Sequence, residues 1–155
     1  MGFSRLYFDE DNQGPPSLVA SCQRRVRFEE VDALGMVWHG RYPSYLEDGR
    51  VAFGDKFGLH YPGFRENKIM APIVQMHFDY QAPLRFDETM TIITTLHWCA
   101  ALRLNFSYEI LSSSRALATT GYTVQLFTDE LGDLLLVPPP WIEDFRQRWL
   151  AGEMS

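Results

Sequence analysis

With 155 residues, 46% of them hydrophobic and 14% aromatic, the chain can form one domain with a buried core and is not expected to be disordered. Its formal net charge of −6 at pH 7 disfavours a broad nucleic-acid-binding surface. Cys22 and Cys99 show no metal or redox spacing, and no run approaches the ~20 apolar residues of a membrane span. We therefore expect a soluble, cytoplasmic protein that binds no nucleic acid and does not insert stably into a membrane.

The first 21 residues are predicted to form an N-terminal extension, because they combine a Gly-Pro-Pro segment with an acidic patch. Aromatic residues in it, such as Tyr7 and Phe8, could dock on the body of the protein. One domain is expected over residues 22–155. It begins with a strand at about 21–29, where apolar and charged residues alternate as in a half-buried strand.

A long helix is predicted from Tyr42 to Phe57, where apolar residues recur every three or four positions. Pro43 suits the first turn, because the N–H that proline lacks is not needed there. Gly49 falls on the apolar stripe, although glycine weakens a helix by roughly 1 kcal/mol relative to alanine. This glycine therefore predicts close approach to a sheet, and Gly58 predicts the end of the helix.

Four strands are predicted after a loop at 59–67, because apolar and polar residues alternate in each of four runs. The runs are Ile73–Tyr80, Thr89–Trp98, Leu102–Leu111 and Arg115–Thr128. Short connections between consecutive strands predict an antiparallel meander.

The last segment is predicted to be an amphipathic helix that lies on the body or on a partner subunit, with Trp141, Ile142, Phe145 and Trp149 on its apolar side. The order of elements predicts an α+β fold, in which one long central helix is wrapped by a curved antiparallel sheet of about five strands. One side of that sheet would remain partly apolar. We therefore expect a homo-oligomer, either a dimer or a tetramer of dimers.

Asp32 stands in a polar turn between the first strand and His39-Gly40, at the expected start of the long helix. A carboxylate placed there can serve as a base or a nucleophile. The free backbone N–H groups of a first helical turn can hold a developing oxyanion. The alternative is that Asp32 only stabilises its turn, as aspartates very often do.

The segment VDALGMVWHGRY, residues 31–42, followed by Glu47 and Arg50, resembles the signature of hotdog-fold acyl-CoA thioesterases. The subgroup most similar is the 4-hydroxybenzoyl-CoA thioesterase type, which includes the Tol–Pal-associated thioesterases. The likeness continues through Tyr80–Arg85 and ends with a closing strand, turn and proline, so that it covers about residues 22–145.

This resemblance implies a hotdog fold and hydrolysis of an acyl-CoA thioester to a free acid and coenzyme A, with no metal or bound cofactor. It implies that Asp32 is the nucleophile or the general base, without deciding which. It also places the backbone N–H of His39 or Gly40 against the thioester carbonyl, while the His39 side chain could orient substrate or water, or bond within the helix start. Gly40 stands where the family more usually has alanine.

The predicted substrate is an acyl-CoA, or an acyl group on an acyl carrier protein, with the acyl chain in an apolar channel at a dimer seam. Arg41 stands where the family often has Asn or a small residue, so it could meet a substrate carboxylate or phosphate, or face water. Tyr42 and Tyr45 are candidates for substrate binding that also fit the buried stripe of the helix. Arg85 and Arg103 are candidates for binding the phosphates of coenzyme A, with solvated arginines as the alternative.

Several patterns limit the other possible functions. Glu47 and Arg50 could have roles at the rim of the site or between subunits, and the alternative is an ion pair with each other on the helix surface. No His/Cys cluster and no Gly-x-Ser-x-Gly motif is present, which disfavours a metal site and a serine hydrolase. Two alternatives stay open: a same-fold acyl-thioester hydratase or dehydratase, for which only His39 could supply the second proton-transfer group, and a non-catalytic acyl-CoA-binding module.

Overall fold

The computed structural model describes residues 7–8 and 13–154, so most of the predicted extension, residues 1–6 and 9–12, lies outside the described residues. The helices and strands of the described part are β1 (Leu18–Arg25), α1 (Tyr42–Phe57), α2 (Tyr61–Glu66), β2 (Ile73–Tyr80), β3 (Thr89–His97), β4 (Arg103–Leu111), β5 (Leu117–Leu126) and α3 (Pro140–Leu150). The long helix has the predicted bounds. β1 begins at Leu18, so the boundary predicted after residue 21 falls inside a strand.

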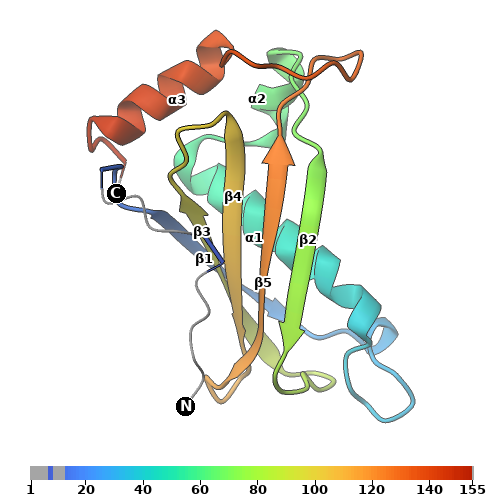
Figure 1. Ribbon diagram of the computed structural model, residues 1–155. Coiled ribbons are helices and arrows are strands. Elements are labelled where there is room, and N and C mark those ends of the chain that lie inside the picture. The colour runs from blue at the N-terminus through green and yellow to red at the C-terminus, as the bar shows by residue number, and fades with distance from the viewer. Residues whose placement is uncertain (1–6, 9–12, 155) are drawn as a thin grey trace.

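One antiparallel sheet of five strands, in the order β1-β3-β4-β5-β2, curves around α1. Figure 1 shows α1 crossing one face of this sheet diagonally, with its first turn beside the C-terminal end of β2. The predicted α+β architecture, a long helix held by a curved antiparallel sheet, is therefore confirmed.

The predicted pairing of consecutive strands is wrong for β2. This strand pairs with β5 at one edge of the sheet, whereas β3 pairs with β1 and β4 near the other edge. The connection at 81–88 crosses the end of the sheet and pairs with the segment before α1: Val37 N–H donates to the Leu84 carbonyl at 2.8 Å, and Met36 bridges Arg85. The connection from β2 to β3 can therefore be short and still cross the sheet, because its backbone groups bond to the segment before α1 and not to a neighbouring strand.

The core lies between α1 and the concave face of the sheet. On α1, Tyr45, Leu46 and Phe53 are at most 1% exposed. Helix and sheet approach closely at Gly49, where a Cβ atom would lie 2.2 Å from Thr94 Oγ1 and 3.0 Å from Ile92 Cγ2 on β3. The close helix–sheet contact predicted from this glycine is therefore confirmed.

The loop predicted at 59–67 contains a short helix, α2. His60 caps it by accepting a hydrogen bond at Nδ1 from the Gly63 N–H at 3.0 Å, and Pro62 lies in its first turn. A Cβ on Gly63 would lie 2.3 Å from the Trp141 ring of α3. Six residues are too few to form a stable helix alone, so this packing stabilises α2, and the local sequence did not indicate it.

The C-terminal helix α3 lies on the body of the same chain, the first of the two predicted positions. Ile142, Phe145 and Trp149 are buried, and Trp149 Nε1 donates to the Pro16 carbonyl at 2.8 Å. Tyr7 also docks on the body, with its ring centroid 4.8 Å from that of Tyr122. Within residues 7–8 and 13–154, no helix is both long and apolar enough to cross a membrane.

Replacing Gly49 with alanine tests the helix–sheet contact. The better helix propensity of alanine would add about 1 kcal/mol of stability, but overpacking against Thr94 and Ile92 costs about 1–3 kcal/mol. We predict a net loss of about 1–2 kcal/mol in the free energy of unfolding, measured by urea titration. The control Glu47→Ala, at an exposed position of α1, should change it by less than about 0.5 kcal/mol. A Gly49→Ala protein as stable as the parent would contradict the close contact.

Candidate active site

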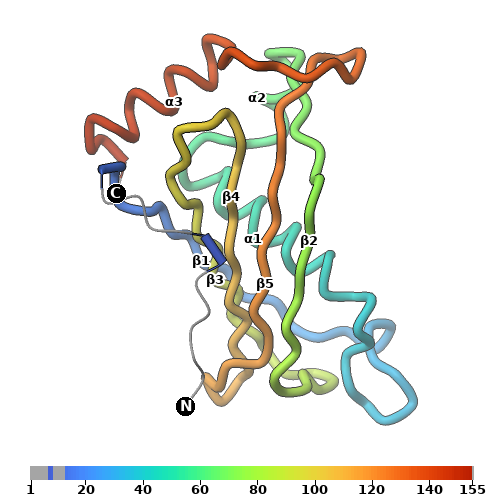
Figure 2. Tube along the Cα trace, viewed as in Figure 1, coloured from blue at the N-terminus to red at the C-terminus, as the bar shows by residue number. Residues whose placement is uncertain are grey.

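Residues 31–37 form a small hairpin that carries Asp32. Val31 bridges Val37, and Asp32 N–H donates to the Met36 carbonyl at 2.8 Å. The reversal needs a positive φ, which Gly35 provides at 77° without the strain that a side chain would cause. Figure 2 shows this loop reaching out beside the C-terminal end of β2 and the first turn of α1.

The carboxylate of Asp32 is exposed and holds the hairpin with one of its oxygens. Oδ1 accepts hydrogen bonds from the backbone N–H groups of Leu34 at 2.8 Å and Met36 at 3.2 Å. Its other oxygen, Oδ2, forms no hydrogen bond within the described residues. The turn-stabilising role and a chemical role are therefore compatible, because they use different oxygens.

The chain enters α1 through a 3₁₀ turn, His39–Arg41. Arg41 N–H donates to the Trp38 carbonyl at 2.9 Å, whereas the N–H groups of His39 and Gly40 have no acceptor in the described part of the chain. The carbonyl of His39 accepts a hydrogen bond from the Tyr80 hydroxyl at 3.0 Å, which ties the turn to β2. Two unpaired N–H donors at a helix start can stabilise negative charge on an oxygen atom.

Gly40 has a packing reason to lack a side chain. A Cβ at this position would lie 2.3 Å from the Trp38 ring, and that ring also contacts the His39 ring, with the centroids 5.0 Å apart. The glycine that stands in place of the family's more usual alanine therefore matches the bulky Trp38 two residues earlier.

An open hollow of about 370 Å³ lies between this turn and the end of β2, lined by Asp32, Met36, Val37, Trp38, His39, Tyr42, Tyr80, Gln81, Ala82 and Pro83. Two of the three predicted catalytic residues, Asp32 and His39, thus line the same space. Tyr42 is 3% exposed and forms its buried wall. Burial raises the pKa of the Tyr42 phenol, so this wall stays uncharged.

A buried ion pair anchors the hairpin to β1. Glu30, 1% exposed, accepts a hydrogen bond from Arg24 at 2.5 Å, and Arg24 also pairs with Asp48 of α1. Burial opposes the charge of Arg24, but hydrogen bonds and attraction from Asp48 and Glu30 outweigh it and raise the Arg24 pKa. The Glu30 carbonyl accepts from Trp38 N–H at 2.9 Å. This network holds both ends of the loop that carries Asp32.

The other predicted substrate-binding residues do not line the hollow. Arg41 donates to the Glu29 carbonyl at 3.1 Å, so its guanidinium supports the loop. Tyr45 is fully buried beneath Arg24, with the guanidinium carbon 4.9 Å from the ring centroid. Arg85 is exposed beside Met36 at the rim. Arg103 begins β4, near the opposite end of the sheet, away from Asp32 of the same chain.

The ion pair considered between Glu47 and Arg50 is not formed. Glu47 is exposed, whereas Arg50 turns toward the sheet and donates to the Tyr108 hydroxyl at 3.1 Å. Positions three apart on a helix are neighbours, so the pair is absent because the Arg50 guanidinium instead reaches the Tyr108 hydroxyl.

Trp38, Tyr80 and Gln81 contribute to the site but were not predicted to. All three belong to the segments that carry the family resemblance, so the sequence did mark them as part of the family pattern. The resemblance did not show that they line the site, because only the folded chain shows β2 ending beside the start of α1.

Comparison with known proteins shows that this fold belongs to a thioesterase. The chain matches the family model of the thioesterase-like superfamily over residues 26–149, and it belongs to that family. It is 27% identical over 112 residues to the acyl-CoA thioester hydrolase YbgC of Escherichia coli, and the matched region covers 69% of this chain and 80% of YbgC.

Solved structures show the same fold. The DHNA-CoA thioesterase from Staphylococcus aureus has a TM-score of 0.77 at 24% identity, covering 89% of this chain and 96% of that one. Slr0204, a 1,4-dihydroxy-2-naphthoyl-CoA thioesterase from Synechocystis, has a TM-score of 0.72 at 18% identity, covering 86% and 96%. The predicted hotdog fold and the predicted class, a thioester hydrolase, are confirmed at the level of the family. The narrower subgroup stays a prediction.

Breaking the buried anchor tests whether it holds the loop. Glu30→Ala removes a buried carboxylate that accepts hydrogen bonds from Arg24 and from the Arg27 N–H, while Arg24 keeps its pair with Asp48, and we predict a loss of about 1–3 kcal/mol in the free energy of unfolding. The matched control is Arg25→Ala, which removes the exposed Arg25–Asp87 pair and should cost at most about 1 kcal/mol. Equal losses in the two variants, measured by urea denaturation, would refute the anchoring role.

Proposed function

We propose that this chain hydrolyses an acyl-CoA thioester to a free acid and coenzyme A, with Asp32 and the N–H groups of His39 and Gly40 at the reacting centre. The observation that carries the proposal is that Asp32 and His39 line one hollow, beside a helix start whose first two N–H groups have no acceptor in the part of the chain that the structure describes. The similarity to YbgC, an acyl-CoA thioester hydrolase, supports coenzyme A as the carrier. An acyl carrier protein is the alternative carrier.

In one form of the mechanism Asp32 is a general base. It takes a proton from water as the water oxygen bonds to the thioester carbon, and the carbonyl oxygen becomes an oxyanion held by the N–H groups of the turn. The carbon–sulfur bond then breaks. The proton on Asp32 passes to the departing sulfur, which leaves as the thiol of coenzyme A.

In the other form Asp32 is the nucleophile. Oδ2, which is free of the hairpin hydrogen bonds, attacks the thioester carbon and displaces the coenzyme A thiolate, which takes its proton from solvent. The resulting acyl–aspartyl anhydride is cleaved by water, which releases the acid and restores the carboxylate. Both forms need one carboxylate oxygen and the same oxyanion site.

Two alternative functions have less support. A hydratase needs a second proton-transfer group placed beside the aspartate, yet the described contacts of the His39 ring are with Trp38, and it forms no hydrogen bond with Asp32. A non-catalytic binding module has no need of the unpaired N–H groups or the free carboxylate oxygen. Turnover decides between these functions.

We also propose a homodimer that forms along β2. Both edge strands have free backbone groups, but they differ in side chains. β2 exposes Ile73, Val74, Met76 and Tyr80 by 37–51%. On β1 the exposed positions are Val19, Ser21, Gln23 and Arg25, of which only Val19 is apolar, and the Val19 carbonyl accepts from Lys56. The edge of β2 is therefore the better surface for a second copy.

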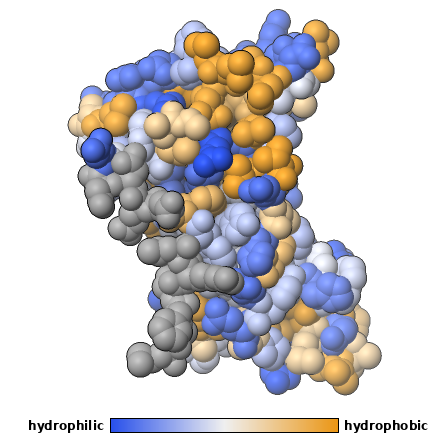
Figure 3. All heavy atoms as spheres, viewed as in Figure 1, coloured by the Kyte–Doolittle hydropathy of each residue, from blue (hydrophilic) through white to orange (hydrophobic). Residues whose placement is uncertain are grey.

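Apolar surface at both ends of β2 supports this dimer. Beside its C-terminal end Leu34 is 75% and Trp38 51% exposed; beside its N-terminal end Met70 is 47% and Leu134 53% exposed. Figure 3 shows hydrophobic surface over the end of the molecule near α2, and a smaller area by the hairpin of residues 31–37. Antiparallel pairing of two β2 strands would bring each end of one copy to the opposite end of its partner.

The compartment proposed is the cytoplasm. Cys22 and Cys99 are both free thiols, as suits a reducing environment. Burial raises the pKa of the Cys22 thiol, which keeps it in the less reactive protonated form.

Asp32→Asn tests the chemical role without removing the turn. The asparagine side-chain oxygen can still accept from the N–H groups of Leu34 and Met36, so the hairpin should be retained. We predict that kcat on acyl-CoA substrates, measured by release of the free thiol, falls by about 10²–10⁴-fold. Thermal stability should be unchanged.

The panel should include aryl, short and long acyl-CoAs. Full activity in Asp32→Asn would contradict the chemical role of Asp32 and show that this residue only stabilises its turn. Binding of acyl-CoA without turnover of any panel member by the parent protein would favour the binding module.

A charge on the edge of β2 tests the dimer. Val74→Glu should give a monomer by light scattering coupled to size exclusion, because it would put a charge from each copy on the apolar surface along the pair of β2 strands. Val19→Glu on β1, where Val19 is similarly exposed at 44%, should leave the dimer intact. A dimer in both variants, or a monomeric parent, would exclude assembly through β2.

A further inference from the structure

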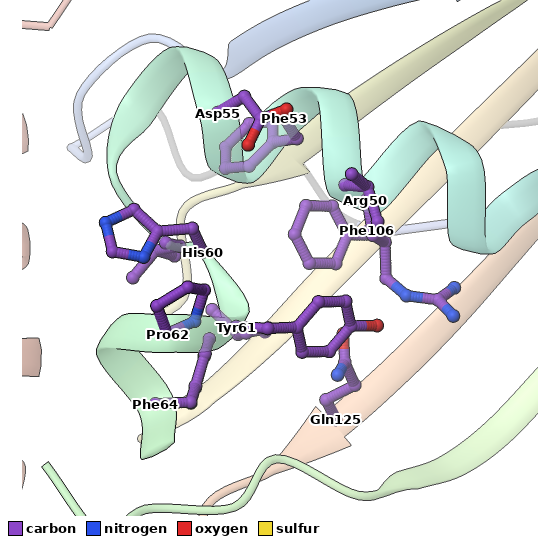
Figure 4. A pocket seen from close by; sticks show the side chains of 12 residues that line it. Arg50, Phe53, Asp55, His60, Tyr61, Pro62, Phe64, Phe106 and Gln125 are labelled. Carbon is purple, nitrogen blue, oxygen red and sulfur yellow. The ribbon is translucent and has the colours of Figure 1, made fainter. Parts of the chain in front are cut away.

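A second pocket lies on the concave side of the sheet, away from the hairpin of residues 31–37. It is bounded by α1, α2, β4 and β5, has a volume of about 210 Å³, and its apolar walls include Phe53, Leu59, Phe64, Leu104 and Phe106 (Figure 4). An apolar protein cavity of about 150 Å³ is enough to bind benzene. This pocket is therefore large enough for one ring or a short chain with a substituent.

One wall of this pocket is polar, and its hydrogen-bonding capacity is only partly used. Gln125 donates its side-chain N–H to the Ala71 carbonyl at 2.7 Å, which fixes the orientation of the amide. Its oxygen, Oε1, is buried and has no hydrogen-bond partner among residues 7–8 and 13–154. A buried acceptor without a partner costs free energy, so this oxygen favours a ligand that brings a donor.

Arg50 supplies donors on the same wall. Its guanidinium gives one hydrogen bond to the Tyr108 hydroxyl and forms no ion pair with any described carboxylate. Tyr108 in turn bonds Thr123, which lies two residues before Gln125 on β5, so these two β5 side chains share a face of the sheet. Figure 4 shows the Tyr61 ring reaching from α2 toward the side where Arg50 and Gln125 lie.

The proposed dimer would bring this pocket to the reacting centre of the other copy. α2 lies beside the N-terminal end of β2, whereas Asp32 lies beside its C-terminal end. Antiparallel pairing of two β2 strands interchanges these ends. The hollow of one copy would then open toward the pocket of its partner, on the side of the sheet that carries α1.

We propose that this pocket receives the far end of the acyl group, and that Arg50 and Gln125 select acyl groups with a hydroxyl there. This inference rests on the proposed thioesterase function. A hydroxyl matches the wall because it can accept from an Arg50 N–H and donate to Gln125 Oε1 at once. A carboxylate would accept from Arg50 but set its oxygens against the Gln125 oxygen. A plain hydrocarbon would leave both groups unpaired.

Matched substrate pairs test this assignment. The coenzyme A thioesters of benzoate, 3- and 4-hydroxybenzoate, 4-methylbenzoate and 4-carboxybenzoate are compared, together with hexanoyl- and 6-hydroxyhexanoyl-CoA. We expect kcat/KM to be at least about tenfold higher for a hydroxyl-bearing member than for its unsubstituted, methyl and carboxyl counterparts. Arg50→Met and Gln125→Met should each reduce that ratio to about twofold or less. Glu47→Ala, on the exposed side of α1, should keep the parent ratio.

A binding measurement separates this proposal from the proposed hydrolysis. Calorimetry gives the affinities of the free acids, 4-hydroxybenzoate against benzoate and 6-hydroxyhexanoate against hexanoate, for the parent and for both variants. One outcome is that the parent protein binds the hydroxy acids more tightly, that Arg50→Met and Gln125→Met abolish this preference, and that no thioester is cleaved. This outcome would support the assignment of the pocket and overturn the proposed hydrolysis. Rapid cleavage without hydroxyl preference, or a preference that survives both substitutions, would overturn the pocket assignment and leave the hydrolysis intact.

Discussion

The close approach of α1 to β3 at Gly49 is the contact on which the site depends. Because no side chain separates helix and sheet there, the sheet can curve around α1 and the helix start is held beside the end of β2. Tyr80 then reaches the His39 carbonyl, and the connection at 81–88 pairs with the segment before the helix. The unpaired N–H groups of the first turn are thus fixed by packing far from them.

The loop that carries Asp32 is restrained at both ends by polar contacts in addition to this packing. Glu30 and Arg24 form a buried pair at its base, and the Glu30 carbonyl holds Trp38 near its end. Such a pair adds little net stability, but it fixes geometry, because alternative arrangements would leave a charge buried without its partner. The carboxylate of Asp32 divides its two oxygens between the hairpin and the hollow.

The sequence predicted the elements whose patterns are local. The apolar stripe of α1 and the alternation in β2 gave both elements their observed bounds, and Gly49 indicated the helix–sheet contact. It did not predict the strand order, because a short link can cross the end of a sheet as easily as turn back. It did not predict α2, which is stabilised by Trp141 from a distant segment. In the candidate site, the family signature predicted Asp32, whereas the position of Tyr80 required the folded chain.

A crystal structure of the Asp32→Asn variant with a bound acyl-CoA is the most direct test of the central claim, that the helix start and Asp32 form one reacting centre. The predicted result places the thioester carbonyl oxygen about 2.7–3.1 Å from the N–H nitrogen of His39 or Gly40, with residue 32 beside the thioester carbon. A thioester bound elsewhere, with both N–H groups facing only solvent, would contradict it.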